Sequence, residues 1–344
     1  MLTAIAAIVI FSLLITIHEF GHFITAKIFG VRVHEFSIGM GPAILKWGKG
    51  ETKYSVRILP IGGYVKLEGE DEESDDEKAL NNQPYWKKLI VLVAGSFMNL
   101  VLGLIVAIIF VAPNKEIAVP VISEFPPSSP LEQAGFEKGD VITEVEGYNI
   151  HTMKEVQFQM YLYDGQGTMN IEGKRDGRKI SAELTPEYID AESRYVIGFV
   201  GTVINNSPLR TVQYGYYETL FCGKSIFIGI KRIFTGSGMS EVSGPVGIVS
   251  VIGDAVGETK NDFWNGIYYL LYLLMNITIS LGVMNLLPIP ALDGGRVLIT
   301  LIEIVSRRKI PAEKEGLIHF IGFGLLIALM IYATYGDILR LLKG

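Results

Sequence analysis

The sequence HEFGH, residues 18–22, stands inside an almost unbroken apolar segment at the start of the chain. Residues four apart lie on one face of an α-helix, so the imidazoles of His18 and His22 can reach one metal ion. Glu19 lies beside them, where a carboxylate can accept a proton from a water molecule that the metal activates. The pattern is typical of zinc peptidases and predicts a helix that carries two metal ligands and a general base.

The setting of this motif is unusual, because residues 5–17 are apolar enough to lie in a bilayer. A histidine or a carboxylate at membrane depth is costly and is a functional residue by default. The simpler interpretation is that these side chains reach toward water from a helix end. It needs a separate reason for each of His18, Glu19 and His22, so we favour hydrolytic chemistry within a bilayer or at its edge.

Composition places the chain among membrane proteins, since its 344 residues are 49% hydrophobic and its mean hydropathy is +0.36. The net charge is only −6 and no broad basic patch is present, which argues against nucleic acid as a partner. A single cysteine, Cys222, excludes an intrachain disulfide framework. We interpret Cys222 as a small residue that fills space in a membrane segment.

Four segments have the length of about 20 apolar residues that a bilayer core requires. They are residues 2–29, 89–112, 263–287 and 317–335. A fifth stretch, residues 214–234, carries four charged side chains, so we expect an amphipathic helix at the interface and leave open whether it spans.

Charge placement predicts the orientation of these spans. Lys27 follows the first span, Lys87 and Lys88 precede the second, and residues 307–309 precede the fourth, so these positions are expected on the inner side. Both termini and the chain between the second and third spans then lie outside. Position 18 lies roughly 25 Å along the first helix, so the metal site is expected nearer the inner face. The first basic residue comes too late for a signal peptide, and we expect no cleavage.

The inner loop between the first two spans is expected to hold a β-hairpin close to the metal. Residues 53–59 alternate polar and apolar side chains, residues 60–63 break the pattern, and residues 64–67 resemble a returning strand. The hairpin is either a plain surface feature or a template that holds an extended substrate by strand addition. The acidic run at 68–77 is expected to be solvated and disordered.

Residues 115–202 differ sharply in composition and predict a small β-rich module on the outer side. A short helix ends near Gly135, a strand ends at Gly147, and two further strands at 168–173 and 179–184 flank a turn at 175–177. After the third span, the prolines of the sequence NLLPIPALDGGR at 285–296 are expected to break the helix at membrane depth. Non-helical backbone at that depth is tolerated only where protein or a water-filled cavity surrounds it. Asp293 there is either a helix cap, which its spacing alone favours, or a third metal ligand.

Together these features resemble the site-2 protease family of intramembrane zinc metalloproteases. The resemblance is to its bacterial branch with an outward PDZ domain, the sigma-E-regulating protease type, in a form with one PDZ domain. Residues 134–147 are similar to the central signature of bacterial PDZ domains, and residues 37–42 and 59–66 are similar to the glycine loop and membrane-associated hairpin of that branch. Residues 94–99 resemble its second-span motif, with Ser96 where a proline is usual, which leaves a local helix kink open.

The resemblance implies a polytopic α-helical membrane protein with about four transmembrane helices, an inner β-hairpin and one outward β-rich PDZ domain. The implied parts are residues 1–114 with the first two spans, 115–202 as the PDZ domain, 203–262 as an interfacial segment, and 263–344 with the last two spans.

The resemblance also assigns the site residues. His18, His22 and Asp293 would hold one zinc ion per chain, Glu19 would be the general base, and Asn285 would hydrogen-bond the substrate backbone. Further substrate contacts are expected on the glycine loop and the hairpin, at Gly39, Gly41, Tyr54, Val56, Ile58, Gly62 and Gly63.

The implied substrates are single-span membrane proteins, such as anti-sigma factors and remnant signal peptides, in the bacterial cytoplasmic membrane. A peptide or substrate segment is expected at the PDZ domain.

Two rival interpretations are a metal transporter and a catalytically inactive PDZ scaffold. A transporter predicts polar residues in several spans along one path, whereas the only stray is His319, which we interpret as a hydrogen-bonded packing residue. A scaffold predicts loss of one of the metal-site residues, and all are present.

Overall fold

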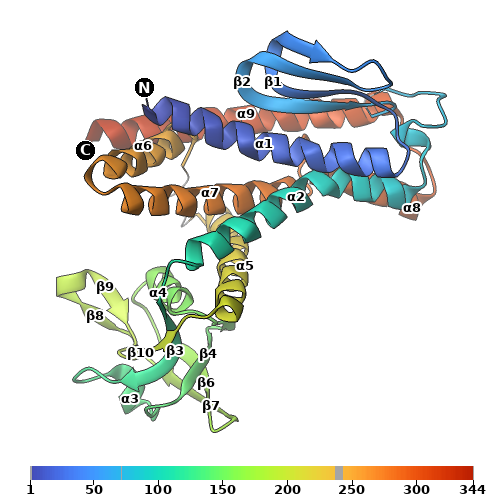
Figure 1. The fold of residues 1–344 in the computed structure, drawn as a ribbon. Helices are drawn as coiled ribbons and strands as arrows, with labels where there is room; N and C mark the ends of the chain where they lie inside the picture. Colours follow the sequence, from blue (N-terminus) through green and yellow to red (C-terminus); the bar gives the residue numbers. More distant parts are fainter. Residues whose placement is uncertain (1, 71, 237–242, 344) are drawn as a thin grey trace. The chain divides into compact units, whose positions relative to one another are not determined.

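The computed structural model describes residues 2–70, 72–236 and 243–343. The chain forms two compact units (Figure 1). The first comprises Met1–Phe110 and Cys222–Gly344, and we call it the helical unit; the second is Val111–Phe221, the β-rich unit. The helix α5 (Pro208–Phe234) contributes residues to both units.

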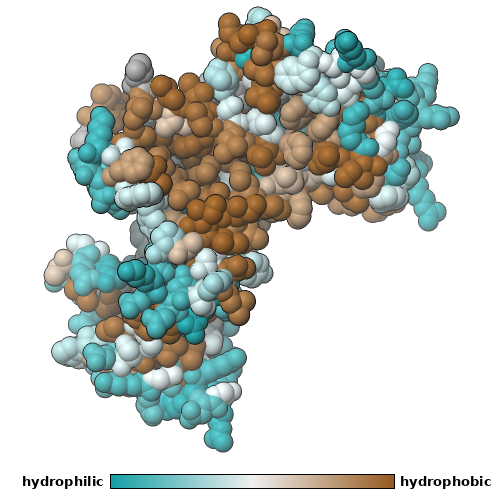
Figure 2. Space-filling model, viewed as in Figure 1, coloured by the Kyte–Doolittle hydropathy of each residue, from teal (hydrophilic) through white to brown (hydrophobic). Residues whose placement is uncertain are grey.

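The helical unit is built largely from long apolar helices. Its helices are α1 (Leu2–Ile28), α2 (Tyr85–Val111), α6 (Pro245–Asn261), α7 (Phe263–Asn285), α8 (Asp293–Ser306) and α9 (Ala312–Lys343). Among the described residues, α1, α2, α7 and residues 313–342 of α9 are long and apolar enough to cross a membrane, which confirms the four predicted apolar helices. Figure 2 shows hydrophobic side chains over much of the visible face of this unit, a surface suited to lipid.

A twisted sheet of two long strands, β1 (Val33–Trp47) and β2 (Lys53–Leu67), lies beside α1 (Figure 1). Both strands bend, so that residues 35–38 of β1 pair with β2 on each of their two sides. Phe36, for example, is opposite both Tyr54 and Val65. The sheet therefore presents four antiparallel segments, although only two strands build it.

The predicted hairpin between residues 53–59 and 64–67 is wrong, because β1 lies between those two segments. The turn that joins β1 to β2 is at residues 48–52 instead. Pro60 has no N–H to donate and Gly62 has a φ of +87°, so this part of the chain bends β2 without ending it. Gly39 and Gly41, with φ of +86° and +84°, bend β1 in the same way.

A polar cluster joins the paired segments of this sheet. Glu35 Oε1 accepts hydrogen bonds from Ser55 Oγ at 2.7 Å and from Arg57 Nη2 at 2.8 Å, and Arg57 Nε donates to Ser37 Oγ at 2.9 Å. Burial opposes ionisation of Glu35, but the hydrogen bonds from Ser55 and Arg57 outweigh it and lower the pKa of Glu35 to about 2. The cluster therefore fixes the register of β1 against β2 through a charged side chain.

The acidic run after β2 is packed against the helical unit, which contradicts the expectation of a disordered segment. Glu68 contacts both His34 and Ser74, and Asp76 pairs with Arg32 at 3.0 Å. His34 and Arg32 lie far from these acidic residues in the sequence, so local composition did not indicate the contacts. Of this run, only residue 71 lies outside the described residues.

The β-rich unit contains an antiparallel sheet with the strand order β10-β3-β4-β6-β7, and the short strand β5 also pairs with β4. Its elements are β3 (Glu116–Glu124), α3 (Pro130–Gln133), β4 (Val141–Val145), β5 (Tyr148–Asn149), α4 (Met153–Leu162), β6 (Met169–Arg175), β7 (Arg178–Leu184), β8 (Glu187–Ile189), β9 (Arg194–Val196) and β10 (Val200–Asn205). The short helix and three strands that sequence predicted are therefore present. Sequence missed α4, whose capping box at Thr152 and Glu155 was the available signal.

The core of the β-rich unit is apolar and includes Ile122, Leu131, Ile142 and Ile171, each at most 1% exposed. The chain enters and leaves this sheet at adjacent points, because Asn206 N, after β10, donates to Lys115 O, before β3, at 2.8 Å. A closed core and adjacent ends are what an inserted domain requires.

Candidate metal centre

Two glycines create space for the site where α1 crosses α2. A Cβ on Gly21 would lie 2.3 Å from Ala94 O, so the two helix backbones touch at this point. A Cβ on Gly95 would lie 2.3 Å from His22 Nε2 and 2.8 Å from His18 Nε2. Because any side chain at position 95 would displace both rings, the hydrogen of Gly95 is what lets the two imidazoles converge.

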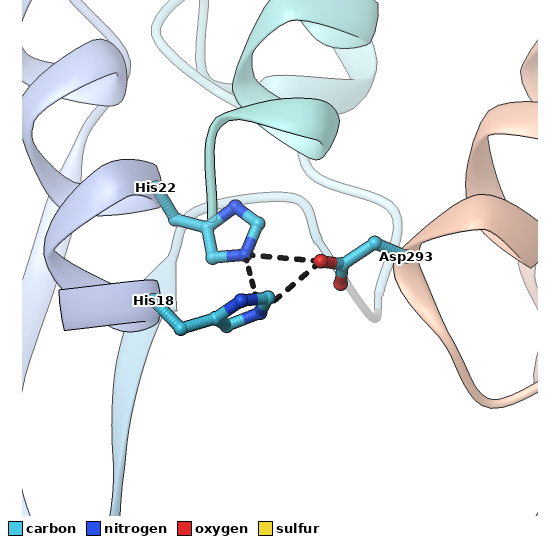
Figure 3. Close-up of side chains that lie close together, drawn as sticks. All are labelled: His18, His22 and Asp293. Carbon is cyan, nitrogen blue, oxygen red and sulfur yellow. Dashed lines mark hydrogen bonds and ion pairs between the residues drawn. The ribbon is translucent and has the colours of Figure 1, made fainter. Parts of the chain in front are cut away.

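Three side chains from α1 and α8 meet at one point (Figure 3). His18 Nε2 and His22 Nε2 are 3.2 Å apart, and Asp293 Oδ2 lies 3.2 Å from the first and 3.4 Å from the second. The two histidines are each 8% exposed, and 21% of the Asp293 side chain is exposed. The structure thus brings together three potential ligand atoms that are separated by up to 275 positions in sequence.

The dimensions of this triangle suit zinc. Ligand atoms at about 2.0–2.1 Å from a tetrahedral zinc ion lie about 3.3–3.4 Å from one another. The three observed separations are 3.2, 3.2 and 3.4 Å. Asp293 Oδ2 is also buried without a hydrogen-bond donor among the described residues. Three atoms that direct lone pairs at one point repel one another, whereas a cation at that point would attract all three.

Groups behind the two imidazoles contact their outer nitrogens. His22 Nδ1 donates to Val91 O at 2.8 Å, which leaves the lone pair of Nε2 directed at the centre. His18 Nδ1 lies 3.3 Å from the buried amide of Asn99, whose Oδ1 has no other partner among the described residues. With the amide turned so that Oδ1 faces the ring, Asn99 accepts the Nδ1 proton and His18 Nε2 is likewise free for a metal.

Asp293 is the first residue of α8 rather than its cap. The cap position is Leu292, and among the described residues no side chain caps this helix end. The Asp293 carboxylate points at the two histidines instead (Figure 3). The structure therefore favours the ligand alternative over the cap that sequence spacing alone had favoured.

Glu19 lies next to the triangle and is held by β2. Val65 N donates to Glu19 Oε2 at 3.0 Å, and a Cβ on Gly63 would lie 3.7 Å from Glu19 Cγ. Glu19 also lines a cavity of about 580 Å³, whose other walls are residues 64–70 and 72–74 together with His34. Many of these side chains are polar, so the cavity can bring water to a carboxylate on an otherwise apolar helix.

The other predicted substrate contacts fall in three places. Asn285 is the half-buried last residue of α7, eight positions before Asp293. Gly39, Gly41 and Gly62 lie at the bends of the sheet, and Gly63 lies close to Glu19, whose Cγ would be 3.7 Å from a Cβ at that position. Tyr54, Val56 and Ile58 lie within β2, where Ile58 is 57% exposed. Their contact with substrate stays a prediction.

Sequence reasoning missed three supporting groups: Gly95, Asn99 and the N–H of Val65. Gly95 and Asn99 both fall in the second-span stretch that resembled the family motif, so that resemblance was the available signal. The contact of Val65 had no such signal, because it depends on how β2 folds back across β1.

Comparison with known proteins identifies the class of enzyme that this fold and site define. The model of Peptidase family M50 matches residues 6–329, and the chain belongs to that family. It is a zinc metalloprotease of the site-2 protease type.

The relatives extend over the whole chain. A Clostridium acetobutylicum protein, named "Putative zinc metalloprotease", is 38% identical over 97% of this chain and 96% of its own. Zinc metalloprotease RasP of Oceanobacillus iheyensis is 32% identical over 99% of this chain and 100% of its own. Regulator of sigma-W protease RasP of Bacillus subtilis is 28% identical over 98% of this chain and 99% of its own length.

A solved structure also matches part of the chain. The PDZ domain of the SdrC-like protein from Listeria monocytogenes covers 26% of this chain and 90% of its own, with 19% identity and a TM-score of 0.22. At that score the likeness carries no weight in assigning the β-rich unit.

Proposed function

We propose that this zinc metalloprotease cleaves single-span membrane proteins within the bilayer or at its edge. The observation that carries the proposal is that His18 and His22, on a helix apolar enough to span, meet Asp293 at the start of α8, which follows a second such helix, with Glu19 beside them. Remnant signal peptides and anti-sigma factors are the expected substrates; the name of the Bacillus subtilis relative, a regulator of sigma-W protease, supports the second class.

In the proposed reaction, His18, His22 and Asp293 hold one zinc ion per chain. Zinc, when bound, activates a water molecule and polarises the scissile carbonyl. Glu19 accepts the proton of the attacking water and returns it to the leaving amine. The hydrogen bond from Val65 N holds one oxygen of the Glu19 carboxylate, so the base keeps its orientation through both transfers. Asn285 would hold the substrate backbone from the end of α7.

A substrate helix must unwind before it is cut, because a helix shields its carbonyls. The bent sheet of β1 and β2 supports a route for this step, since Gly63 and Val65 of β2 lie against Glu19. A substrate strand that adds to this sheet would gain backbone hydrogen bonds in place of those lost from its helix. We therefore keep Tyr54, Val56 and Ile58 as proposed contacts along β2.

We propose that the enzyme resides in a bacterial cytoplasmic membrane with both termini and the β-rich unit outside. Lys27, Lys87 and Lys88 would then lie inside, and the metal site would be nearer the inner face. The proposed divisions at 1–114, 115–202, 203–262 and 263–344 follow this arrangement; residues 237–242 of the third lie outside the described residues. Within the described residues α5 is not among the four span candidates, which supports an interfacial position.

We propose that residues 115–202 form a PDZ domain that binds a peptide or excludes substrates with a bulky outer part. The sequence similarity of residues 134–147 and the antiparallel sheet with its own core support this role. Trimming of the substrate by another protease would then come before the intramembrane cut.

Substrate trapping tests the proposed function directly. The variant Glu19→Gln, expressed in the host in place of the wild-type chain, should accumulate uncut single-span proteins bound to it. The same proteins should be shortened in cells with the wild-type enzyme. If only soluble proteins or multi-span proteins accumulate, the proposed substrate class is wrong.

A further inference from the structure

The turn between α7 and α8 comprises residues 286–292, and Asp293 follows it as the first residue of α8. Within this turn Ala291 has a φ of +75°. That left-handed conformation brings the Cβ of an ordinary residue too close to its own backbone and is uncommon outside glycine. Something in the surrounding structure must therefore hold Ala291 where it is.

The side chain of His319, on α9, contacts the turn at this residue. Ala291 N donates to His319 Nδ1 at 2.8 Å. An Nδ1 that accepts a hydrogen bond carries no proton, so the ring proton is on Nε2, which lies 3.8 Å from Glu315 Oε1. Only 16% of the His319 side chain is exposed, whereas its neighbour Phe320 is 73% exposed.

A second contact fixes the same turn one residue earlier. A Cβ on Gly322 would lie 2.4 Å from Pro290 Cβ and 2.6 Å from Pro290 O, so the backbone of α9 touches this proline. His319 and Gly322 are three residues apart and share one face of α9. That face therefore meets two consecutive residues of the turn, just before the carboxylate of the metal site.

We propose that His319 is a positioning residue for Asp293. By accepting the hydrogen bond of Ala291, it holds the turn in its left-handed conformation and fixes where α8 begins. The Asp293 carboxylate is then placed 3.2 and 3.4 Å from the two histidine nitrogens. This role rests on the proposed zinc site, since it acts through a ligand of that site.

Zinc affinity of the full chain, purified in detergent and measured by competition with a chelator, tests this role. His319→Leu removes the acceptor at similar size and should weaken zinc binding about 10- to 100-fold, the range typical of groups that orient a ligand. His319→Asn places Oδ1 the same number of bonds from Cα as Nδ1 and should stay within about 3-fold of wild type. Phe320→Ala, on the same helix, is the matched control and should bind zinc as wild type does.

Ala291→Gly tests the mechanism, because glycine adopts a positive φ without a steric penalty. Added to His319→Leu, it should recover part of the lost zinc affinity. Unchanged affinity in His319→Leu would overturn the proposal, and so would equal losses in His319→Leu and His319→Asn. Failure of Ala291→Gly to recover any affinity would overturn it as well, because the histidine would then act by packing alone.

Asp293→Ala separates this inference from the proposed zinc site. If Asp293→Ala leaves zinc affinity unchanged, the proposed metal ligand is wrong, and with it the role of His319. If Asp293→Ala loses zinc while His319→Leu keeps it, only the role of His319 is wrong. Thermal unfolding of each chain without metal shows whether a loss of affinity reflects the site or the fold.

Discussion

Three of the four residues at the metal centre are each contacted by a polar atom behind the side chain. Val91 O and the Asn99 amide contact the outer nitrogens of His22 and His18, and Val65 N holds Glu19. Orienting contacts of this kind reduce the freedom that each side chain loses when metal or substrate binds. The site is therefore held by groups of the chain itself, and substitutions can test the proposed base and the space around the proposed ligands separately.

Glu19→Gln should keep zinc and lose cleavage. The amide oxygen can still accept from Val65 N, so the fold and the three ligands are unaffected, but an amide cannot take a proton from water. We expect cleavage of a single-span reporter in vesicles to fall about 10²- to 10⁴-fold. The zinc content of the purified variant serves as its control. Substantial remaining cleavage with zinc bound would refute the assignment of Glu19 as the base.

Gly95→Ala should weaken zinc binding although none of the proposed ligands is substituted. The added Cβ would lie 2.3 Å from His22 Nε2, so that ring or α2 must move. We expect zinc affinity to fall at least about 10-fold. Gly229→Ala is the matched control, because a Cβ there meets nothing within 4 Å. If both variants bind zinc as wild type does, the close packing of α2 on the histidines does not shape the site.

Among the structural elements, α1 was predictable from sequence because a local pattern determines it. The 3.6-residue period placed His18 and His22 on one face, and the apolar run indicated the helix. The sheet beside α1 was not predictable in the same way. Its segments pair around a central stretch of β1, and such pairing depends on contacts far apart in sequence, which a turn signal at residues 60–63 does not reveal.

The sheet of β1 and β2 should lose stability in acid as Glu35 becomes protonated. The pKa of Glu35 is about 2 in the fold and 4.5 in an unfolded chain. A lowered pKa stabilises the fold fully above pH 4.5, and this contribution disappears as the pH falls from 4.5 toward 2. Hydrogen-exchange protection of residues 33–38, corrected for the intrinsic rate at each pH, should fall over that range.

Glu35→Gln provides the comparison, because it cannot ionise. Its protection should be lower than that of wild type at pH 6 and should change less between pH 4.5 and 2. Equal pH dependence in both chains would show that another acid controls the sheet.

At the scale of the whole molecule, the two units were predictable as a contrast in composition between apolar spans and a β-rich insert. The proposed third ligand was less so, since the spacing of Asp293 alone favoured a helix cap. Only the turn at residues 286–292, with its prolines and its contact to α9, turns the carboxylate toward α1. The family resemblance indicated this ligand, whereas spacing alone favoured the cap.

Removal of residues 116–205 should leave cleavage of short substrates intact. Asn206 N is 2.8 Å from Lys115 O, so two or three glycines can join the ends without strain. If the insert excludes bulky substrates, the shortened enzyme should also cut a substrate whose outer domain has not been trimmed. Cleavage should be compared with the full chain on both substrates. Complete loss of activity on the short one, in a chain that still binds zinc, would refute a filtering role.

Zinc-edge X-ray absorption on the purified full chain tests the central claim most directly. For wild type and Glu19→Gln, we predict one zinc ion per chain with two imidazole nitrogens and a carboxylate oxygen at about 2.0–2.2 Å. Asp293→Ala and His22→Ala should contain little zinc after the same purification. Full zinc content in those two variants, or a first shell without imidazole, would contradict a site formed by His18, His22 and Asp293.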